Sequence, residues 1–350
     1  MLKAVAPITA VKFSAGLIMP NTEPPIETVA AAESYKQEIL SAVHRGDASL
    51  QFQPLMSFYL TKNLSVAEIE KGAAEKKIFA AKSYPWGATT NSQWGFRNIL
   101  EAKEQLSAME RVGMPLLLHG EVHLNDKGEE EDPYYGEDIF LSDVLPRLLE
   151  KFPDLKISLE HISTKEGAQF MEENGKEGKL VATLTPHHLM YDRRQVFSGG
   201  YHSLLHCKPL IMRAKDRDAL RALATKGLLF ISAGTDTAPH AEQKKFSSRV
   251  AFGVFNSPIA VEMYTQVFDE MNALDPIKGD APHGASKLEG FLSLNGPKFF
   301  GIEPSSETMT LVKKDWQLTE PVVTSEGVNI WPVGHVQHGL GNETFHWQTK

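Results

Sequence analysis

The chain has 350 residues, of which 42% are hydrophobic and 23% charged, so it is long enough to bury a large core. Its formal net charge is -8 at pH 7 and its lysines and arginines are scattered, which argues against nucleic acid or an anionic membrane surface as a partner. The single cysteine, Cys207, excludes an internal disulfide and favours a reducing compartment, so a cytoplasmic location is expected.

Apolar runs of strand length recur between residues 13 and 233, and each is followed by a turn and a segment of helical periodicity. The predicted strands are 13–19, 52–60, 78–84, 115–121, 156–162, 180–186 and 228–233. The predicted helices between them are 28–44, 66–75, 98–112, 141–152, 165–173 and 216–225. Ser65 and Thr164 are expected to cap helix N-termini, and Gly113 and Gly227 to lie at helix C-termini. This alternation predicts βα units around a parallel sheet.

The predicted strands number seven, and a (β/α)₈ barrel closes with eight. The expected fold is therefore an α/β barrel of the TIM type whose first strand is missing from this chain, the shortfall lying before Phe13. Beyond the seventh strand we predict helices over 260–274 and 288–294, a polar insertion over 275–286 and a short strand pair in the tail 323–350. Residues 1–350 are expected to form one domain, with the tail as a short C-terminal extension.

Polar side chains stand at the C-terminal ends of four predicted strands. Lys82 closes the third strand, His119 the fourth and His161 the fifth, and Asp236 follows the seventh. The C-terminal ends of barrel strands meet at one face, where α/β barrels carry their chemistry. A lysine, two imidazoles and a carboxylate converging there form a ligand set suited to two metal ions.

Each of these residues also has an ordinary structural explanation. An isolated lysine usually extends its amine to solvent, a lone histidine after an apolar run is usually a core residue, and Asp236 lies in a sequence typical of turns. Their convergence favours metal binding. A buried, neutral Lys82 amine can react with carbon dioxide to give a carbamate that bridges two metals, and neutral imidazole is the commonest zinc ligand.

Other chemistry-bearing residues are given structural interpretations. His187 and His188 end the sixth predicted strand and are expected at the mouth of the pocket, not among the ligands. Cys207 follows His206, which resembles a metal-binding pair, but a free buried thiol is expected. The chain has no glycine-rich phosphate loop before a helix, no G-x-S-x-G and no H-E-x-x-H, so nucleotide-binding, serine-hydrolase and zincin classes lack support.

A set of ordered motifs resembles the class II dihydroorotases of the amidohydrolase superfamily. The motifs are Met-Pro-Asn-Thr-Glu-Pro-Pro at 19–25, Ala-Lys-Ser-Tyr-Pro at 81–85 with Ala-Thr-Thr-Asn-Ser at 88–92, His-Gly-Glu-Val at 119–122, Glu-His-Ile-Ser-Thr-Lys at 160–165, Thr-Pro-His-His-Leu at 185–189, Gly-Thr-Asp-Thr-Ala-Pro-His at 234–240 and Asn-Gly-Pro at 295–297. They cover nearly the whole chain in the family's order. The resemblance implies a zinc enzyme that reversibly converts N-carbamoyl-L-aspartate to L-dihydroorotate in pyrimidine biosynthesis.

By position, the resemblance also implies the metal site. Lys82 would be the carboxylated lysine that bridges two zinc ions. His119 and His161 would bind one zinc ion, and Asp236 would bind the other and act as the catalytic base. The proton that Asp236 takes from the attacking water would go to the departing ring nitrogen.

The substrate residues implied by the resemblance come from three segments. Asn21 and His240 would hold the substrate carboxylate, and Thr89 and Thr90 would lie on a mobile loop that closes over it. Phe252 stands where the family usually has a small residue.

One motif of the family is missing. The family's first strand carries His-x-His-x-Arg, whose histidines bind the second zinc ion and whose arginine grips the substrate carboxylate. Residues 1–7 are similar to the segment just downstream of that motif. The chain is therefore expected to start at an internal methionine and to have an incomplete second zinc site.

Two other functions compete with this one. A barrel that has lost half of its metal site could serve as a non-catalytic binding or regulatory protein. A hydantoinase-like cyclic amidohydrolase is the second, although Asn21, Thr89, Thr90 and His240 suit an acidic substrate better. The expected partner is a small-molecule substrate and, if the chain assembles, a second copy in a homodimer. Membrane binding is not expected, because no apolar window approaches the length of about 18 residues that a span requires.

Overall fold

The computed structural model describes residues 1–125, 127–274, 286–336 and 343–350, so all of the predicted insertion except Ser286 lies outside the described residues. The main sheet has seven parallel strands in the order β1-β2-β3-β4-β5-β6-β7. These strands are β1 Ala15–Ile18, β2 Gln53–Tyr59, β3 Ile78–Ser83, β4 Leu116–His119, β5 Ile157–Glu160, β6 Leu180–Leu184 and β7 Ile231–Ala233. Every predicted strand is confirmed. The paired segments are mostly shorter than predicted because the apolar runs continue into unpaired ends.

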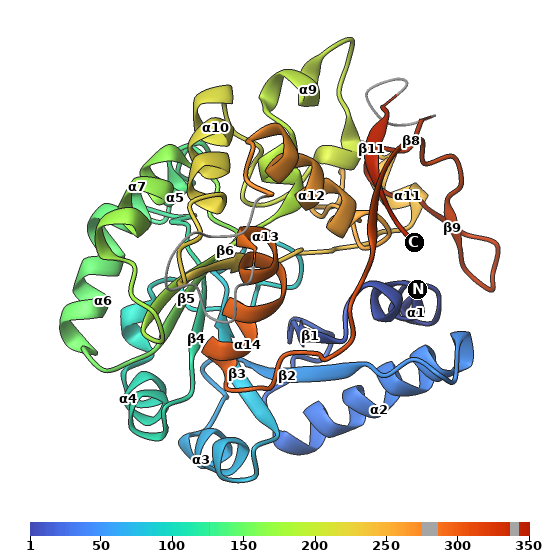
Figure 1. Cartoon of the computed structure of the whole chain (residues 1–350). Coiled ribbons are helices and arrows are strands. Elements are labelled where there is room, and N and C mark those ends of the chain that lie inside the picture. Colours follow the sequence, from blue (N-terminus) through green and yellow to red (C-terminus); the bar gives the residue numbers. More distant parts are fainter. Residues whose placement is uncertain (126, 275–285, 337–342) are drawn as a thin grey trace.

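Helices lie around the outside of this sheet (Figure 1). Those that follow the strands are α2 Val29–Gly46, α3 Val66–Ala74, α4 Lys103–Val112, α6 Leu145–Lys151, α7 Lys165–Asn174 and α10 Ala214–Ala224. Three of the predicted caps are confirmed: Ser65 accepts from Glu68 N, Thr164 accepts from Gly167 N, and Gly113 ends α4 with φ 72°. The fourth is wrong, because the C-cap of α10 is Thr225 and Gly227, with φ 79°, lies two residues beyond it. No helix among the described residues is both long and apolar enough to cross a membrane.

Shorter elements complete this part of the chain. They are α1 Leu2–Lys12, η1 Ile99–Glu101, α5 Gly136–Ile139, the π-helical turn η2 Phe140–Val144, α8 Pro186–Met190, α9 Arg193–Phe197, η3 Ser203–Leu205 and α11 Glu242–Lys245. The remaining elements are α12 Ala260–Glu270, α13 Lys287–Glu289, the π-helical turn η5 Gly290–Leu294, α14 Asn295–Phe300, β8 Leu311–Trp316, β9 Val322–Val323, β10 Asn329–Ile330 and β11 Phe345–Thr349.

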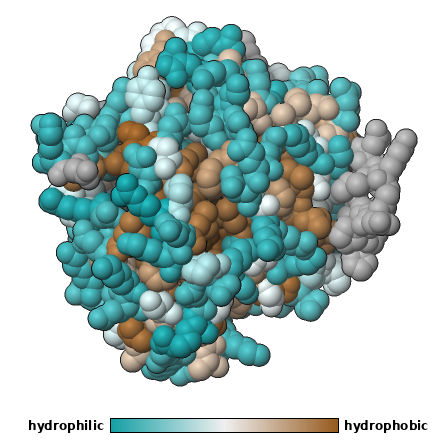
Figure 2. All heavy atoms as spheres, turned by 90° about the vertical axis from the view of Figure 1, so that its left-hand side faces the viewer, coloured by the Kyte–Doolittle hydropathy of each residue, from teal (hydrophilic) through white to brown (hydrophobic). Residues whose placement is uncertain are grey.

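The core forms between the sheet and its outer helices. All four residues of β4 and all five of β6 are buried, as expected for parallel strands covered on both faces. On α2, Ala32, Ile39 and Val43 belong to the same core as the strand residues. Hydrophilic residues dominate the face of the molecule shown in Figure 2, and apolar residues show between them.

The sheet is open between its first and last strands. Among the described residues, β1 pairs only with β2 and β7 pairs only with β6. A closed barrel of eight strands is therefore not formed by these residues, in agreement with the strand count from the sequence.

The helix α1 was not indicated by the sequence pattern. It contains Pro7, and proline in a helix interior removes a backbone hydrogen bond. Tertiary contacts hold it instead: Thr9 Oγ1 donates to Ser257 Oγ at 3.0 Å, and the Lys12 amine contacts Glu262 of α12 and Thr349 of β11. A helix that depends on such distant partners leaves little periodic signal.

The C-terminal predictions are correct only in part. The tail does form strands, but β11 pairs with β8, which precedes the predicted range, and the small β9–β10 pair lies beside it. The last predicted helix continues past residue 294 through α14. Pro297 is compatible with this because it follows the π-helical turn η5, where the regular helical hydrogen-bond pattern is already interrupted.

Close packing of α3 on the sheet yields a stability prediction. A Cβ atom at Gly72 would lie 2.7 Å from Ile78 Cγ1 and 3.0 Å from Phe58 Cε2. Gly72→Ala is expected to lower the free energy of unfolding by about 1–3 kcal/mol through overpacking, although alanine favours a helix by about 1 kcal/mol. Urea unfolding monitored by circular dichroism measures the change. Lys71→Ala, exposed on the same helix, is the control and should shift stability by less than about 0.5 kcal/mol; equal values for both variants would contradict the prediction.

Candidate active site at the strand ends

The four predicted metal ligands all lie at the C-terminal edge of the sheet. Lys82 is the next-to-last residue of β3, His119 is the last residue of β4, His161 follows β5 directly, and Asp236 comes shortly after β7. The pairing of β4 with β5 sets His119 opposite Glu160, so His161 projects just beyond it. Parallel register thus brings these side chains to one edge, as predicted.

Two of these residues have strained backbones. His161 has φ 45° and Asp236 has φ 43°, in the left-handed region that residues other than glycine rarely adopt. Such conformations cost on the order of 1–3 kcal/mol and persist where the surroundings enforce them. At His161 the backbone N–H donates to Thr183 Oγ1 at 2.8 Å, which holds the turn in place. Strain at the ends of β5 and β7 marks these two turns as candidate functional positions.

The two imidazoles have the spacing of ligands on one metal ion. His119 Nδ1 and His161 Nε2 lie 3.1 Å apart, and both side chains are buried. Two nitrogens on one tetrahedral zinc ion are about 3.3 Å apart, given Zn–N distances of about 2.0–2.1 Å. Desolvation lowers the pKa of His119 and brings the pKa of His161 well below its usual range, so both rings are neutral, as zinc ligands must be.

Glu121 orients the first imidazole. Its Oε2 lies 2.7 Å from His119 Nε2, and its Oε1 lies 3.3 Å from Lys208 Nζ. Because this carboxylate accepts the Nε2–H, Nδ1 is left as the atom that can bind a metal. A carboxylate in this position is the usual outer partner of a metal-binding histidine. The sequence placed Glu121 two residues after His119 but did not assign it this role.

Lys82 and Asp236 have pKa values displaced towards neutrality. Lys82 is 2% exposed, and desolvation lowers the pKa of its amine to about 8, although Glu160 and Asp236 act in the opposite direction. Desolvation raises the pKa of Asp236 to about 7, against the nearby Lys82 amine and with the help of Glu160. An amine that can lose its charge and a carboxyl that can exchange a proton near pH 7 are what carbamate formation and acid–base chemistry need.

Glu137 supports the turn that follows His161. Its buried carboxylate accepts hydrogen bonds from the backbone N–H and the hydroxyl of both Ser163 and Thr164, at 2.6 to 3.0 Å. These two residues follow His161 almost directly, so Glu137 anchors the turn that carries the ligand. Sequence reasoning missed it, because Glu137 lies far from its partners in the chain and its neighbours carry no motif.

Asn21 contacts the segment that carries Thr89 and Thr90, the threonine segment. Asn21 Nδ2 donates to Thr90 O at 2.9 Å, and Asn91 Nδ2 donates back to Asn21 O at 2.9 Å. Tyr84 OH donates to Asn21 Oδ1 at 3.1 Å. The Thr89 N–H donates to Ser92 Oγ at 2.9 Å, which closes the turn. Asn21 therefore joins the segment after β1 to the threonine segment after β3.

His240 stands apart from that contact. Its Nε2 lies 2.7 Å from Phe252 O, so Nε2 carries the proton and donates it, leaving Nδ1 as the free ring nitrogen. Within the described ranges, no hydrogen bond joins His240 to Asn21 or to the threonine segment. The structure thus shows these predicted substrate residues in two groups.

The expectation for His187 and His188 is wrong. Neither lines a pocket mouth, because both are buried, with 0% and 2% of their surfaces exposed. Thr185 caps α8 immediately after β6, and this early helix start turns both side chains into the interior. Cys207 is free and buried, as expected.

Comparisons with known proteins decide the family. No family model matches the chain. A dihydroorotase of Pectobacterium carotovorum is 41% identical over 322 residues, which are 92% of this chain and 87% of that protein. The crystal structure of a dihydroorotase of Saccharomyces cerevisiae in complex with 5-fluoroorotic acid matches with a TM-score of 0.85 and 30% identity, covering 99% of this chain and 93% of that one.

The chain belongs to the dihydroorotase family. Dihydroorotases are hydrolases that act on a cyclic amide in pyrimidine biosynthesis, so the predicted enzyme class is confirmed. An L-hydantoinase of Arthrobacter aurescens, with 15% identity and a TM-score of 0.74 over 99% of this chain and 77% of that one, shares the fold alone. The open seven-stranded sheet is therefore an amidohydrolase barrel lacking one strand among the described residues.

The contact between Glu121 and His119 predicts a loss of zinc affinity when it is removed. Zinc dependence is general in the dihydroorotase family, and outer partners of metal ligands contribute about 10–100-fold to metal affinity. Glu121→Ala should weaken zinc binding at His119 and His161 by that factor, as seen in one step of a competition with a chromophoric chelator. Glu130→Ala is the control, because it removes an exposed carboxylate from the same segment after β4. Unchanged affinity in Glu121→Ala would show that the carboxylate does not orient a ligand.

Proposed function

We propose that the strand-end cluster is the active site of a zinc-dependent dihydroorotase that interconverts N-carbamoyl-L-aspartate and L-dihydroorotate. The observation that carries this proposal is the 3.1 Å spacing of His119 Nδ1 and His161 Nε2 beside the desolvated Lys82 and Asp236. The substrate class follows from the family, since the curated relatives carry the name dihydroorotase.

In this proposal Lys82 joins two zinc positions. Its neutral amine adds to carbon dioxide and loses a proton, which gives a carbamate with two oxygen ligands. His119 and His161 complete one position. The other position draws only on the carbamate and Asp236 among the described residues, so it is incomplete by the usual standard of three or four protein ligands. When bound, zinc polarises the ring carbonyl and makes water more acidic.

Asp236 moves the proton. In hydrolysis the ionised carboxylate accepts a proton from the attacking water and returns it to the ring nitrogen as the carbon–nitrogen bond breaks. In ring closure the same steps run backwards. Desolvation raises the pKa of the metal-free Asp236 carboxyl to about 7, which opposes the lowering that a bound zinc ion would cause.

In this proposal, the substrate carboxylate is bound by Asn21, next to the threonine segment, and by His240. Asn21 can offer its amide N–H groups to a carboxylate once it releases Thr90 O, which couples binding to movement of the threonine segment. His240 donates its Nε2–H to Phe252 O, so Nδ1 must gain a proton before it can donate to a carboxylate. Carboxylate binding at His240 therefore takes up a proton.

The wider setting follows from the same proposal. The partner is a small acidic substrate, neither nucleic acid nor membrane is required, and the enzyme works in the cytoplasm as one domain spanning 1–350. If it assembles, a homodimer is the expected form.

A non-catalytic role is the second candidate, and the incomplete second zinc position favours it. A chain that binds dihydroorotate but converts none of it would support that role. A hydantoinase-like specificity would instead appear as faster turnover of hydantoins than of dihydroorotate. Assaying both substrates with the purified, zinc-loaded chain separates the three outcomes.

Asp236→Asn tests the proton carrier. The variant keeps the shape of the side chain but cannot accept a proton, so turnover of dihydroorotate should fall by about 10²–10⁴-fold. Asp218→Asn, at an exposed position, is the matched control. Circular dichroism checks that both variants fold. Turnover by Asp236→Asn close to that of the control would assign the base to another residue.

The pKa of Lys82 predicts how carbamate formation depends on pH. Only the neutral amine reacts, and its fraction rises about tenfold per pH unit below the pKa and levels off above it. With a pKa of about 8, uptake of ¹³C-labelled carbon dioxide at fixed dissolved concentration should accelerate up to about pH 8 and then plateau. Carbon-13 NMR of the carbamate gives the rate. A rise that continues unbroken to pH 10 would show an amine with an ordinary pKa.

A further inference from the structure

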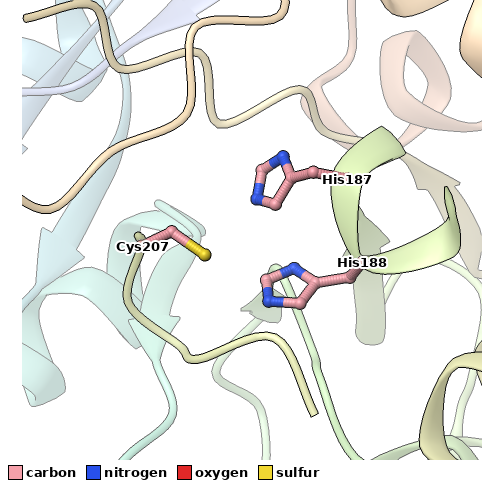
Figure 3. A group of neighbouring side chains, drawn as sticks. All are labelled: His187, His188 and Cys207. Carbon is pink, nitrogen blue, oxygen red and sulfur yellow. The ribbon is translucent and has the colours of Figure 1, made fainter. Parts of the chain in front are cut away.

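A second cluster of side chains that can bind a metal lies beside the strand-end ligands, close enough for His188 to affect the pKa of His161. His187 and His188 come from the start of α8 and Cys207 from the loop after η3 (Figure 3). Each offers one ligand atom, and these atoms all lie within 4.8 Å of one another. All three residues are buried. The cluster shares no ligand with Lys82 and its neighbours.

One atom in this cluster has no hydrogen-bond partner. His187 Nε2 is buried and unpaired, and Figure 3 shows the ring turned towards His188 and Cys207. An unpaired buried polar atom costs about 1–3 kcal/mol. Asn256 Oδ1 is likewise buried and unpaired, and the Nδ2 of the same amide lies 3.2 Å from His187 Nδ1. His187 and Asn256 thus contact each other, and each has one buried atom without a hydrogen-bond partner. This marks a place where a ligand would complete the bonding.

We propose that His187, His188 and Cys207 form an accessory site for a thiophilic metal ion, with Zn²⁺ as the ion that fits best. One thiolate and two imidazoles are ligands that zinc prefers and that Mg²⁺ and Ca²⁺ avoid. His188 Nε2 already donates to Pro209 O at 3.1 Å, the outer hydrogen bond typical of a metal-binding histidine, and this leaves Nδ1 as its ligand atom.

Metal binding requires three local adjustments. Cys207, whose S–H donates to Pro209 O at 3.1 Å, gives its proton to solvent and binds as a thiolate. The Thr185 side chain, whose Oγ1 lies 2.6 Å from His188 Nδ1, turns about its Cα–Cβ bond to free this nitrogen and gives up its cap of α8. His187 moves its proton from Nε2 to Nδ1, where a turned Asn256 amide accepts it through Oδ1 in exchange for its bond to Thr235 O.

The geometry needs a modest contraction. Ligand atoms around a tetrahedral zinc ion are about 3.3–3.7 Å apart, so the most separated pair here must approach by about 1 Å. The fourth position of the ion remains for water. Both α8 and the loop at Cys207 are short segments whose ends can supply this movement.

Cobalt titration of the full, metal-stripped chain tests the site. Cys207 is the only cysteine, and the strand-end ligands contain no sulfur, so a thiolate-to-cobalt charge-transfer band in the near ultraviolet reports on Cys207 alone. We expect the amplitude of the band to correspond to one thiolate–cobalt bond for each chain, with further cobalt bound at the strand-end ligands without the band. Cys207→Ser should abolish it, and His187→Gln should weaken the binding seen in this band by more than about tenfold through loss of one of three ligands.

His206→Gln is the matched control, because His206 precedes Cys207 but does not belong to the set, and it should leave the band intact. Thermal unfolding shows which variants fold, and His187→Gln carries the test if Cys207→Ser does not. Cobalt that binds without the band, at the strand-end ligands only, would overturn the proposal. So would a band of equal affinity in His187→Gln.

Discussion

Parallel pairing of β3, β4 and β5 is the constraint on which the site depends. Each strand presents its C-terminal end at the same edge, so Lys82, His119 and His161 meet although they lie far apart in the sequence. A register shift by one residue would turn a ligand to the opposite face of the sheet. Buried apolar side chains on both faces of β4 and β6 hold that register.

Exclusion of water at this edge sets the protonation state of every candidate catalytic group. The same desolvation lowers the pKa of Lys82, lowers the pKa of both imidazoles and raises the pKa of Asp236. Neutral ligands and a carboxyl that titrates near pH 7 thus have a common cause. Charged groups remain where they are paired, as Glu121 is with His119 and Lys208.

Strained ligands need support from distant parts of the chain. Glu137 anchors the turn after His161, and Ser257 links α1 to the turn after β7, since it accepts from Thr9 Oγ1 and donates to Thr237 Oγ1 at 2.9 Å. Thr237 is the neighbour of Asp236. The first helix and the carboxylate that we propose as the base are therefore mechanically connected, although β1 and β7 do not pair.

The sequence by itself determined the seven strands, most of their helices and the position of four polar residues at strand ends, because periodicity and caps are local signals and strand ends follow from them. Its ordered motifs also identified the family. Only the tertiary structure decided that Glu121 contacts His119, that Glu137 anchors the turn after His161 and that α1 forms around Pro7. It also decided that β11 returns to β8 and that His187 and His188 turn inward near Cys207. These features rest on contacts between residues far apart in the chain, and such contacts leave no periodic pattern from which they could be predicted.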